Sequence, residues 1–216
     1  MVEAINIQRQ TDFQDPGFDP MGELVLTSEK PYRVWVPPNK IIVLGSSQKP
    51  ENECNIKNVL ADEIPVYQRT GGGGAVVLAP TILCIALRFK REEGYYIEHY
   101  FKLGSSVMQQ VLKTEFGLEA KAEHISDLSI NNKKILGCSM YMPKEHTVYL
   151  ASIMVQDSLS DIERYLTHPT KEPEWRKGRS HADFITNISH ELGQELNAEK
   201  FLPLCENFIK DNLDFG

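Results

Sequence analysis

The stretch VYQRTGGGGAVVLAP, residues 66–80, contains four consecutive glycines between two apolar segments that are typical of β-strands. Glycine weakens the interior of a strand or helix because it has no side chain to pack and much conformational freedom to lose. A flexible linker is usually polar, whereas apolar sequence bounds this run on both sides. The stretch therefore predicts a rigid loop in a sheet, whose backbone forms a floor for an elongated ligand and its phosphate.

Two common glycine motifs do not fit this stretch. A phosphate-binding P-loop requires a Lys-Ser/Thr pair after its last glycine, but Ala75, Val76 and Val77 follow here. A dinucleotide-binding fingerprint requires a helix after its glycines, and the sequence at that point is typical of a strand. We therefore expect the glycines to line a binding site, with Arg69 beside them to meet an anion.

The segments around the glycines predict a chain rich in strands, with two longer helices. Strands are expected at residues 32–36, 40–47, 64–70, 75–79, 82–89, 124–130, 133–142 and 146–155, with a hinge near Pro80 and a turn at Asn131-Asn132. Helices are expected at residues 95–116, stopped by Gly117, and at 197–213, with an inner face of Phe201, Leu204, Cys205, Phe208 and Ile209. The capping-box spacing of Ser160 and Glu163 predicts a short helix that opens there.

Length and composition indicate one domain. A chain of 216 residues with 41% hydrophobic residues is long enough for one good core. The pairs Asp15-Pro16 and Asp19-Pro20 predict a flexible arm over residues 1–20, followed by a single domain over residues 21–216. The net charge of −7 argues against binding nucleic acid through a general basic surface. Because the start is polar and no apolar run is long enough for a membrane span, we expect a cytoplasmic protein with no membrane contact.

The four cysteines, Cys54, Cys84, Cys138 and Cys205, lie far apart and form no CxxC pair. A zinc knuckle or a dithiol redox site is therefore not indicated. Cys84 and Cys205 lie in apolar stretches, where an unpaired cysteine usually behaves as a small buried hydrophobic residue.

A second motif, NNKKILGCS at residues 131–139, places two lysines after a turn. Lysines beside a hairpin turn are most often solvated, and we expect this of Lys133. Lys134 begins the apolar strand, and Gly137 again permits a close approach. Lys134 is therefore the better candidate to present its ammonium group to a carboxylate or phosphate in a cleft.

Together the two motifs resemble the lipoate–protein ligase A family within the biotin/lipoate ligase superfamily. The family signatures are an R-x-S/T-G-G-G-A-V loop and a D-G-R-K-I/V-x-G segment, and here RTGGGGAV precedes NNKKILG by about sixty residues. The resemblance extends over roughly residues 22–187. It includes VLGSSQKPENECN at 43–55 and DFITN at 183–187.

The resemblance implies an α+β fold with a mixed β-sheet and packed helices, and an ATP-dependent ligase. In this reaction Mg²⁺-ATP activates lipoate or octanoate to acyl-AMP, and a lysine of a lipoyl carrier domain then takes the acyl group. Carried over by motif, Lys134 is the catalytic residue that holds the carboxylate and the α-phosphate oxygens. The residues implied to bind substrate and nucleotide are Arg69, Thr70, Gly71, Gly72, Gly73, Gly74, Ala75, Val76 and Gly137. No metal-binding residue is implied.

The sequence departs from the family at three places. After A-V the family usually has Phe/Tyr-His-Asp, whereas this chain has Val77, Leu78 and Ala79. Ser46 stands where the family often has arginine. Many members also carry a C-terminal accessory domain that does not follow the last predicted helix. We therefore expect either a separate accessory polypeptide or no need for one.

Three other functions are alternatives to the ligase. Octanoyl and lipoyl transferases of the superfamily use a cysteine thioester in place of ATP, and Cys138, directly after Gly137 of the lysine segment, is the thiol that such a mechanism would use here. A biotin ligase has a loop richer in arginine, whereas this loop has Arg69 alone. A non-catalytic lipoyl- or adenylate-binding protein is the third alternative, since the His-Asp pair is missing. The transferase and the non-catalytic protein remain open at this point.

Overall fold

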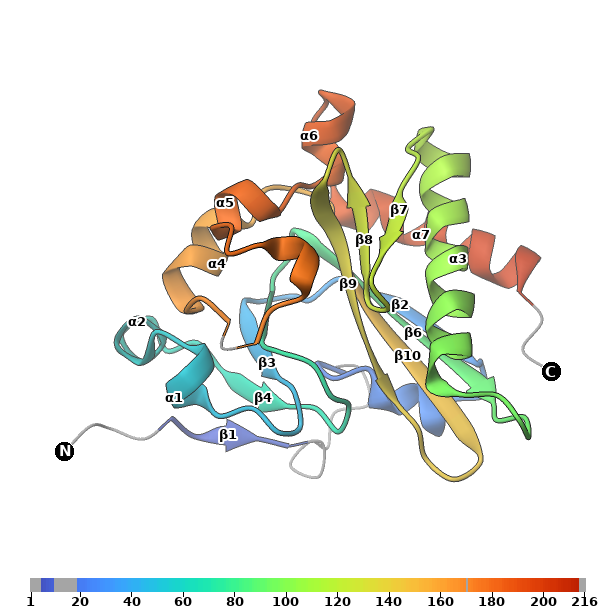
Figure 1. Cartoon of the computed structure of the whole chain (residues 1–216), viewed down its shortest axis with the longest axis horizontal. Helices are drawn as coiled ribbons and strands as arrows, with labels where there is room; N and C mark the ends of the chain where they lie inside the picture. Colours follow the sequence, from blue (N-terminus) through green and yellow to red (C-terminus); the bar gives the residue numbers. More distant parts are fainter. Residues whose placement is uncertain (1–4, 10–18, 170, 214–216) are drawn as a thin grey trace.

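Two β-sheets carry the fold in the computed structural model, which describes residues 5–9, 19–169 and 171–213 (Figure 1). The larger sheet has the order β2-β6-β10-β9-β8-β7, and all its neighbours are antiparallel. Its strands are β2 (Tyr32–Trp35), β6 (Ile82–Lys90), β10 (His146–Met154), β9 (Lys133–Tyr141), β8 (Asp127–Ile130) and β7 (Lys121–Glu123).

The smaller sheet is mixed. Its order is β1-β4-β3-β5, with two parallel pairings followed by an antiparallel one. Its strands are β1 (Ile7–Gln8), β4 (Val66–Gln68), β3 (Ile41–Leu44) and β5 (Val76–Leu78). The predicted strand pair after the glycines is therefore divided: β5 belongs to the smaller sheet and β6 to the larger one. The hinge predicted near Pro80 is where the chain crosses between the sheets.

The longer helices pack on the larger sheet. α3 (Ile97–Phe116) and α7 (Ala198–Asn212) lie along the same side of this sheet (Figure 1). The apolar face of α3 is buried, and Gly117 ends the helix as predicted, with a φ of 67°. In α7 the fully buried residues are Ala198, Phe201, Cys205 and Ile209. Leu204 is 41% exposed, so the predicted inner face was too wide.

The smaller sheet packs between the larger sheet and the short helices. One of its faces shares a core with Ile82, Cys84 and Met154 of the larger sheet. Its other face packs against α2 and α4 through Val59, Ile162 and Tyr165. The short helices are α1 (Pro50–Glu53), α2 (Ile56–Ala61), α4 (Leu159–Tyr165), α5 (His181–Phe184) and α6 (Ile188–Leu192), with 3-10 turns η2 (Glu23–Leu26) and η3 (Glu174–Arg176). An α+β fold with packed helices is confirmed.

The start of α4 differs from the prediction. The helix begins at Leu159, so Ser160 lies inside it and the capping box is wrong. Asp157 accepts the Leu159 N–H through Oδ1 at 2.9 Å, which satisfies one of the free donors of the first turn. The Ser158 hydroxyl is turned away to Thr81 Oγ1 at 2.6 Å. The aspartate side chain has taken the place of the predicted serine cap.

Part of the predicted N-terminal arm packs on the domain. Ile7 and Gln8 pair with β4, and Asp19 is 1% exposed and accepts the N–H groups of Glu23 and Leu24 at 3.0 Å. The Asp15-Pro16 turn lies outside the described residues. A boundary at residues 20/21 therefore stays a prediction.

Helix α3 approaches β10 closely at Gly104, and this contact predicts a stability effect. A Cβ on Gly104 would lie 2.5 Å from the ring of Tyr149, which is fully buried. Overpacking of this kind costs about 1–3 kcal/mol, against a gain of about 1 kcal/mol in helix propensity. Gly104→Ala should therefore lower the free energy of unfolding, measured by urea titration. Ser106→Ala, on the same helix, is the control and should be nearly neutral; equal stability of both variants would contradict the close contact.

Candidate active site

The loop between β4 and β5, residues 69–75, is called the glycine loop, and it folds back against the end of β3. Gly45 N–H donates to Gly74 O at 3.1 Å and Ser46 N–H donates to Gly71 O at 3.0 Å. A Cβ on Gly45 would lie 2.0 Å from Gly73 O, so this position requires glycine. The sequence reasoning missed Gly45, although a glycine directly after an apolar strand was a signal for a close approach.

Arg69 supports the loop from inside. Its side chain is 7% exposed. Nε and Nη2 donate to Gly72 O at 3.1 and 2.8 Å, Nη2 also donates to Gly74 O at 2.9 Å, and Nη1 donates to Val43 O at 3.2 Å. Burial lowers the pKa of this guanidinium to about 10. In this structure its donors are directed at carbonyl groups that converge because the loop curls around them, and a contact of Arg69 with an anion stays a prediction.

Thr70 also forms its hydrogen bonds within the protein. Its backbone N–H donates to Glu23 Oε1 at 2.8 Å, and its hydroxyl donates to the same oxygen. Glu23 begins η2, so this contact ties the loop to the turn before β2. Ala75 and Val76 are partly exposed where the loop enters β5.

The four glycines have two different surroundings. Cβ atoms on Gly71 and Gly73 would lie 3.0 Å from Met140 O and 2.9 Å from Arg69 Nη2, so these two permit tight packing within the protein. A Cβ on Gly72 would have no described atom within 4 Å, and one on Gly74 would first meet Glu53 Oε2 at 3.9 Å. Gly72 and Gly74 are therefore the positions where a ligand can approach the backbone.

A bulge in β9 sets the direction of Lys134. Opposite β8, Leu128 pairs with Leu136 and Ser129 pairs with Lys134, so Ile135 is an extra residue in the ladder. Ile135 and Leu136 are both fully buried in the core under α3 and α7. Lys134 is therefore turned to the opposite face, which it shares with Gly137 and Ser139.

The ammonium group of Lys134 lies over Gly137. A Cβ on Gly137 would be 2.8 Å from both Cε and Nζ of Lys134, which explains the spacing of lysine and glycine in this motif. Nζ forms an ion pair with Asp127 Oδ1 at 2.8 Å. The Asp127 side chain is 3% exposed, and that of Lys134 is 27% exposed. The lysine is therefore held at one side by a buried carboxylate and is open on the other.

The lysine strand and the glycine loop lie against each other. The Cβ position of Gly71 is 3.7 Å from Ser139 Oγ, and that of Gly73 is 3.8 Å from Ser139 Cβ. The structure thus brings Gly71, Gly73 and Gly137 to the face of β9 that carries Lys134. The Arg69 and Thr70 side chains support the loop and do not point at this face.

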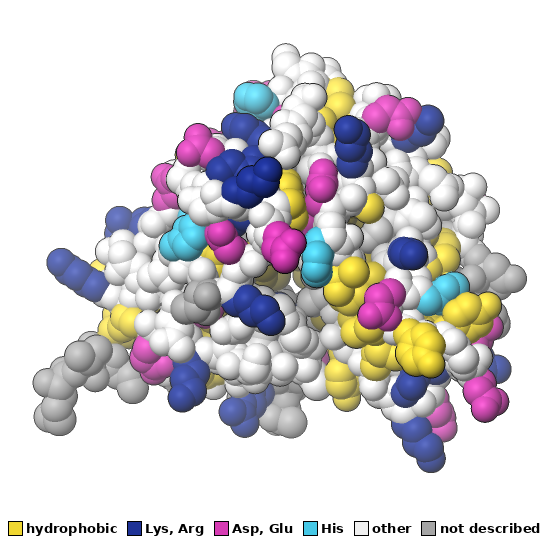
Figure 2. All heavy atoms as spheres, viewed as in Figure 1, with side chains coloured by type: hydrophobic (Ala, Val, Ile, Leu, Met, Phe, Trp, Pro, Cys, Tyr) yellow, Lys and Arg dark blue, Asp and Glu magenta, His cyan; other side chains and the backbone are white. Residues whose placement is uncertain are grey.

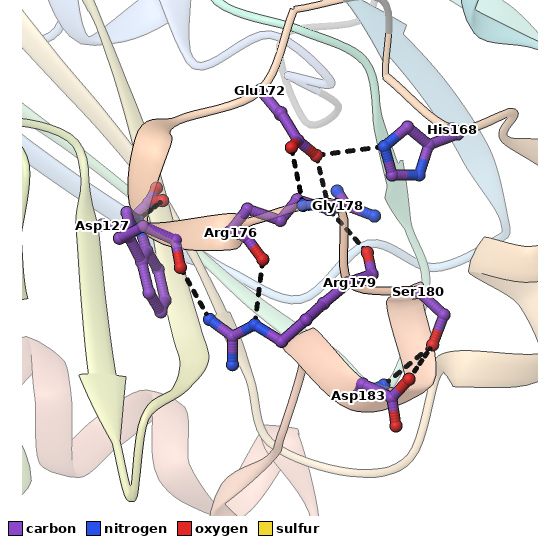
Figure 3. A network of polar contacts seen from close by, with 9 residues as sticks. Asp127, His168, Glu172, Arg176, Gly178, Arg179, Ser180 and Asp183 are labelled. Atoms are coloured by element: carbon purple, nitrogen blue, oxygen red, sulfur yellow. Dashed lines mark hydrogen bonds and ion pairs between the residues drawn. The ribbon is translucent and has the colours of Figure 1, made fainter.

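Segment 171–180 lies next to Lys134, and its contacts were not predicted. Trp175 Nε1 donates to Asp127 Oδ2 at 3.2 Å, and Arg179 Nη2 donates to Trp175 O at 2.9 Å (Figure 3). The sequence from residue 167 to residue 180 is charged and contains two prolines, and this composition does not indicate what the segment contacts. Asp127 did give a signal, since it is an acidic residue that begins an apolar strand.

Cys138 lies on the other face of β9. It packs against the core under α3, beside Tyr149 and Ser105. Burial raises the pKa of its thiol to about 12. Cys84 and Cys205 are buried as predicted. Cys138 is therefore separated from the glycine loop by the strand itself and is protonated near neutral pH.

The departure from the family at Leu78 and Ala79 falls in the core. Both residues are buried, at 5% and 1% exposure, and Leu78 packs in the core between the two sheets. Apolar packing therefore occupies the place where the family has a polar pair.

Charged side chains of both signs surround the shallow hollow on the face shown in Figure 2. Within the described ranges, no three His, Cys, Asp or Glu side chains are grouped so that they could hold a metal ion. In the same part of the chain, no helix combines the length and the apolar character needed to cross a membrane.

Known proteins are similar to this chain in sequence and in fold. "Lipoate--protein ligase 1" of Plasmodium falciparum is 26% identical over 179 residues, which are 82% of this chain and 41% of that protein. A bipartite lipoate protein ligase of Thermoplasma acidophilum has a TM-score of 0.72 at 20% identity, over 86% of this chain and 72% of that chain. A lipoate-protein ligase A bound with ATP has a TM-score of 0.73 at 16% identity, over 96% and 83% of the two chains.

The chain spans about half the length of the curated relatives it matches. The family described as the lipoyl protein ligase A/B catalytic domain matches residues 23–210. Since this match covers most of the sequence, the chain belongs to the family of lipoyl protein ligase A/B catalytic domains.

Proposed function

We propose that this chain is the catalytic part of an ATP-dependent lipoate–protein ligase. It activates lipoate or octanoate to acyl-AMP and transfers the acyl group to a lysine of a lipoyl carrier domain. One observation supports this above the others: the bulge at Ile135 directs the Lys134 ammonium to the face of β9 that the glycine loop covers. A cation and an open stretch of backbone thus lie on the same face of β9.

In the first step the carboxylate of the acid attacks the α-phosphorus of ATP, and pyrophosphate leaves. Negative charge grows on the α-phosphate oxygens during this attack. An ammonium group has three N–H donors, and Asp127 accepts one of those of Lys134. The other two are available for a carboxylate oxygen and an α-phosphate oxygen, which stabilises the charge of the transition state.

In the second step the amine of the carrier lysine attacks the acyl carbon. An amide bond forms, the bond to the phosphate oxygen breaks, and AMP leaves. Lys134 serves the same purpose again, because charge grows on the acyl oxygen and on the departing phosphate. Gly72 and Gly74 leave room for the acyl-adenylate between the two steps.

Mg²⁺ enters this proposal with the nucleotide. The described residues form no metal cluster of their own, so the triphosphate oxygens would supply most of its ligands, and the ion would neutralise part of their charge. We also propose that the acceptor is a lipoyl carrier domain in the cytoplasm, and that the ligase works either with a separate accessory polypeptide or without one.

The position of Cys138 argues against a thioester mechanism and gives a direct test. The Cys138→Ser variant should keep most of its ATP-dependent activity, because the side chain faces the core and forms no covalent intermediate. The measurement is carrier acylation by mass spectrometry, with and without ATP. The transferase predicts the opposite result, since serine is a far weaker nucleophile than a thiol. A thioester trapped on Cys138, with turnover that ignores ATP, would refute the ligase.

One experiment tests the proposed function as a whole. The protein is incubated with Mg-ATP, lipoate or octanoate, and a panel of apo carrier domains, and each carrier is weighed by mass spectrometry. Acid-dependent exchange of pyrophosphate into ATP is measured without carrier to isolate the first step. A ligase shows exchange and carrier acylation. The non-catalytic alternative predicts neither, even when the acid stabilises the fold.

A further inference from the structure

Lys134 is the first member of a chain of contacts that ends in segment 171–180. Asp127 uses its two oxygens separately: Oδ1 pairs with Lys134 Nζ at 2.8 Å, and Oδ2 accepts the indole N–H of Trp175 at 3.2 Å. Because the Asp127 side chain is 3% exposed, water contributes little to its solvation. An unpaired oxygen there would carry the full penalty of a buried polar group. The indole N–H therefore helps to fix the orientation of the carboxylate.

The Trp175 ring is itself held firmly. Its centroid lies 4.5 Å from that of the Phe184 ring, and the Arg179 guanidinium lies 5.4 and 5.0 Å from the Trp175 and Phe184 rings. Arg179 also donates to Trp175 O at 2.9 Å and to Asn132 O at 2.7 Å, which ties the segment to the turn before β9. This packing restricts the indole, so its N–H has a defined direction.

We propose that Trp175 is a positioning residue for Lys134. It orients Asp127, and Asp127 in turn fixes the direction of the ammonium over Gly137. An indole suits this role because it is a neutral donor: a lysine or arginine at the same place would compete with Lys134 for the carboxylate. The consequence for catalysis rests on the proposed function, whereas the consequence for the lysine itself can be measured without it.

The first measurement is the reactivity of Lys134 in the absence of substrate. The protein is treated briefly with acetic anhydride, and acetylation of individual lysines is measured by mass spectrometry, with the neighbouring Lys133 as internal reference. The Trp175→Phe variant keeps an aromatic ring against Phe184 but loses the N–H donor. We expect Lys134 to react severalfold faster in this variant and Lys133 to be unchanged. Equal reactivity of Lys134 in both proteins would overturn the proposal.

Trp35 supplies the matched control for this labelling. It is the other tryptophan of the chain, and its Nε1 is buried without a hydrogen-bond partner among the described residues. The Trp35→Phe variant should leave the reactivity of Lys134 unchanged. An equal increase in both variants would mean that loss of any indole loosens the fold, which would refute a specific role of Trp175.

The second measurement is the rate of acyl-AMP formation. Loss of a hydrogen bond to a buried charged group should lower kcat for pyrophosphate exchange about tenfold in Trp175→Phe, with KM for ATP and acid within about twofold. In an Asp127→Ala background the same change should have no further effect, because the partner of the indole is gone. Effects that add in the double variant would overturn the proposal.

The two measurements distinguish a failure of the proposed function from a failure of the positioning role. If the wild-type protein shows no exchange but Lys134 labelling changes as expected, the proposed function fails and the positioning role is supported. If exchange is normal but labelling is unchanged, the positioning role fails alone. Should Trp175→Phe not fold, replacement of Trp175 by 3-benzothienylalanine removes the N–H with almost no change of shape, and the same outcomes apply.

Discussion

Lys134→Ala is expected to slow acyl-AMP formation about 100- to 1000-fold, equivalent to about 3–4 kcal/mol of lost transition-state stabilisation. The reason is geometric: the Lys134 ammonium lies over Gly137 on the face of β9 that the glycine loop contacts at Ser139. Initial rates of acid-dependent pyrophosphate exchange measure the effect. The variant also leaves Oδ1 of the buried Asp127 without its ion pair, so some loss of stability is expected. Rates are therefore compared well below the unfolding midpoint of the variant.

Lys133→Ala is the matched control for this prediction. Lys133 is the preceding residue of β9, and its Nζ donates to Ala182 O at 3.3 Å, away from the Asp127 ion pair. The same loss of one positive charge should change the exchange rate by less than about twofold at this position. Near-normal exchange in Lys134→Ala, or equal losses in both variants, would show that Lys134 does not have the assigned role.

Gly72→Val is expected to abolish ligand binding while leaving the fold intact. A Cβ at this position meets no described atom within 4 Å, so the free energy of unfolding should change by less than about 1 kcal/mol. The valine side chain would instead fill the open space before the loop, where we place the acyl-adenylate. Thermal unfolding with and without lipoate and ATP measures the effect, since a bound ligand raises the midpoint by mass action. An unchanged ligand-dependent shift in the variant would place the pocket elsewhere.

The neighbouring glycine gives a contrasting control. Gly73 has a φ of 95°, and a Cβ there would lie 2.9 Å from Arg69 Nη2. Gly73→Val should therefore lower the stability of the loop itself, through backbone strain and displacement of the arginine. Loss of binding in this variant is uninformative about the ligand, whereas loss in Gly72→Val with an unchanged apo midpoint is informative. Equal destabilisation by both changes would contradict the described loop.

The local elements were largely predictable from the sequence, because each depends on neighbours in the chain. The helix over α3 ended at Gly117 as predicted, and the hairpin of β8 and β9 formed around Asn131-Asn132. Errors occurred where a side chain had alternatives that the pattern does not show. Ser158 bonds to Thr81, and Asp157 caps α4 instead of the predicted serine. Leu204 falls just outside the buried stripe of α7.

The residue types of the site follow from the sequence alone: a glycine run that no regular strand tolerates, and a lysine three residues before a glycine. The directions of the side chains depend on the packed structure. Arg69 points inward because the carbonyls of the folded loop converge on it. Lys134 lies on the same face of β9 as Gly137 because Ile135 is an extra residue opposite β8, and this bulge lets Ile135 and Leu136 both pack in the core under α3 and α7. Asp127 and Trp175, 48 residues apart, meet for the same reason: only the packed sheet and the segment over it bring them within hydrogen-bond distance.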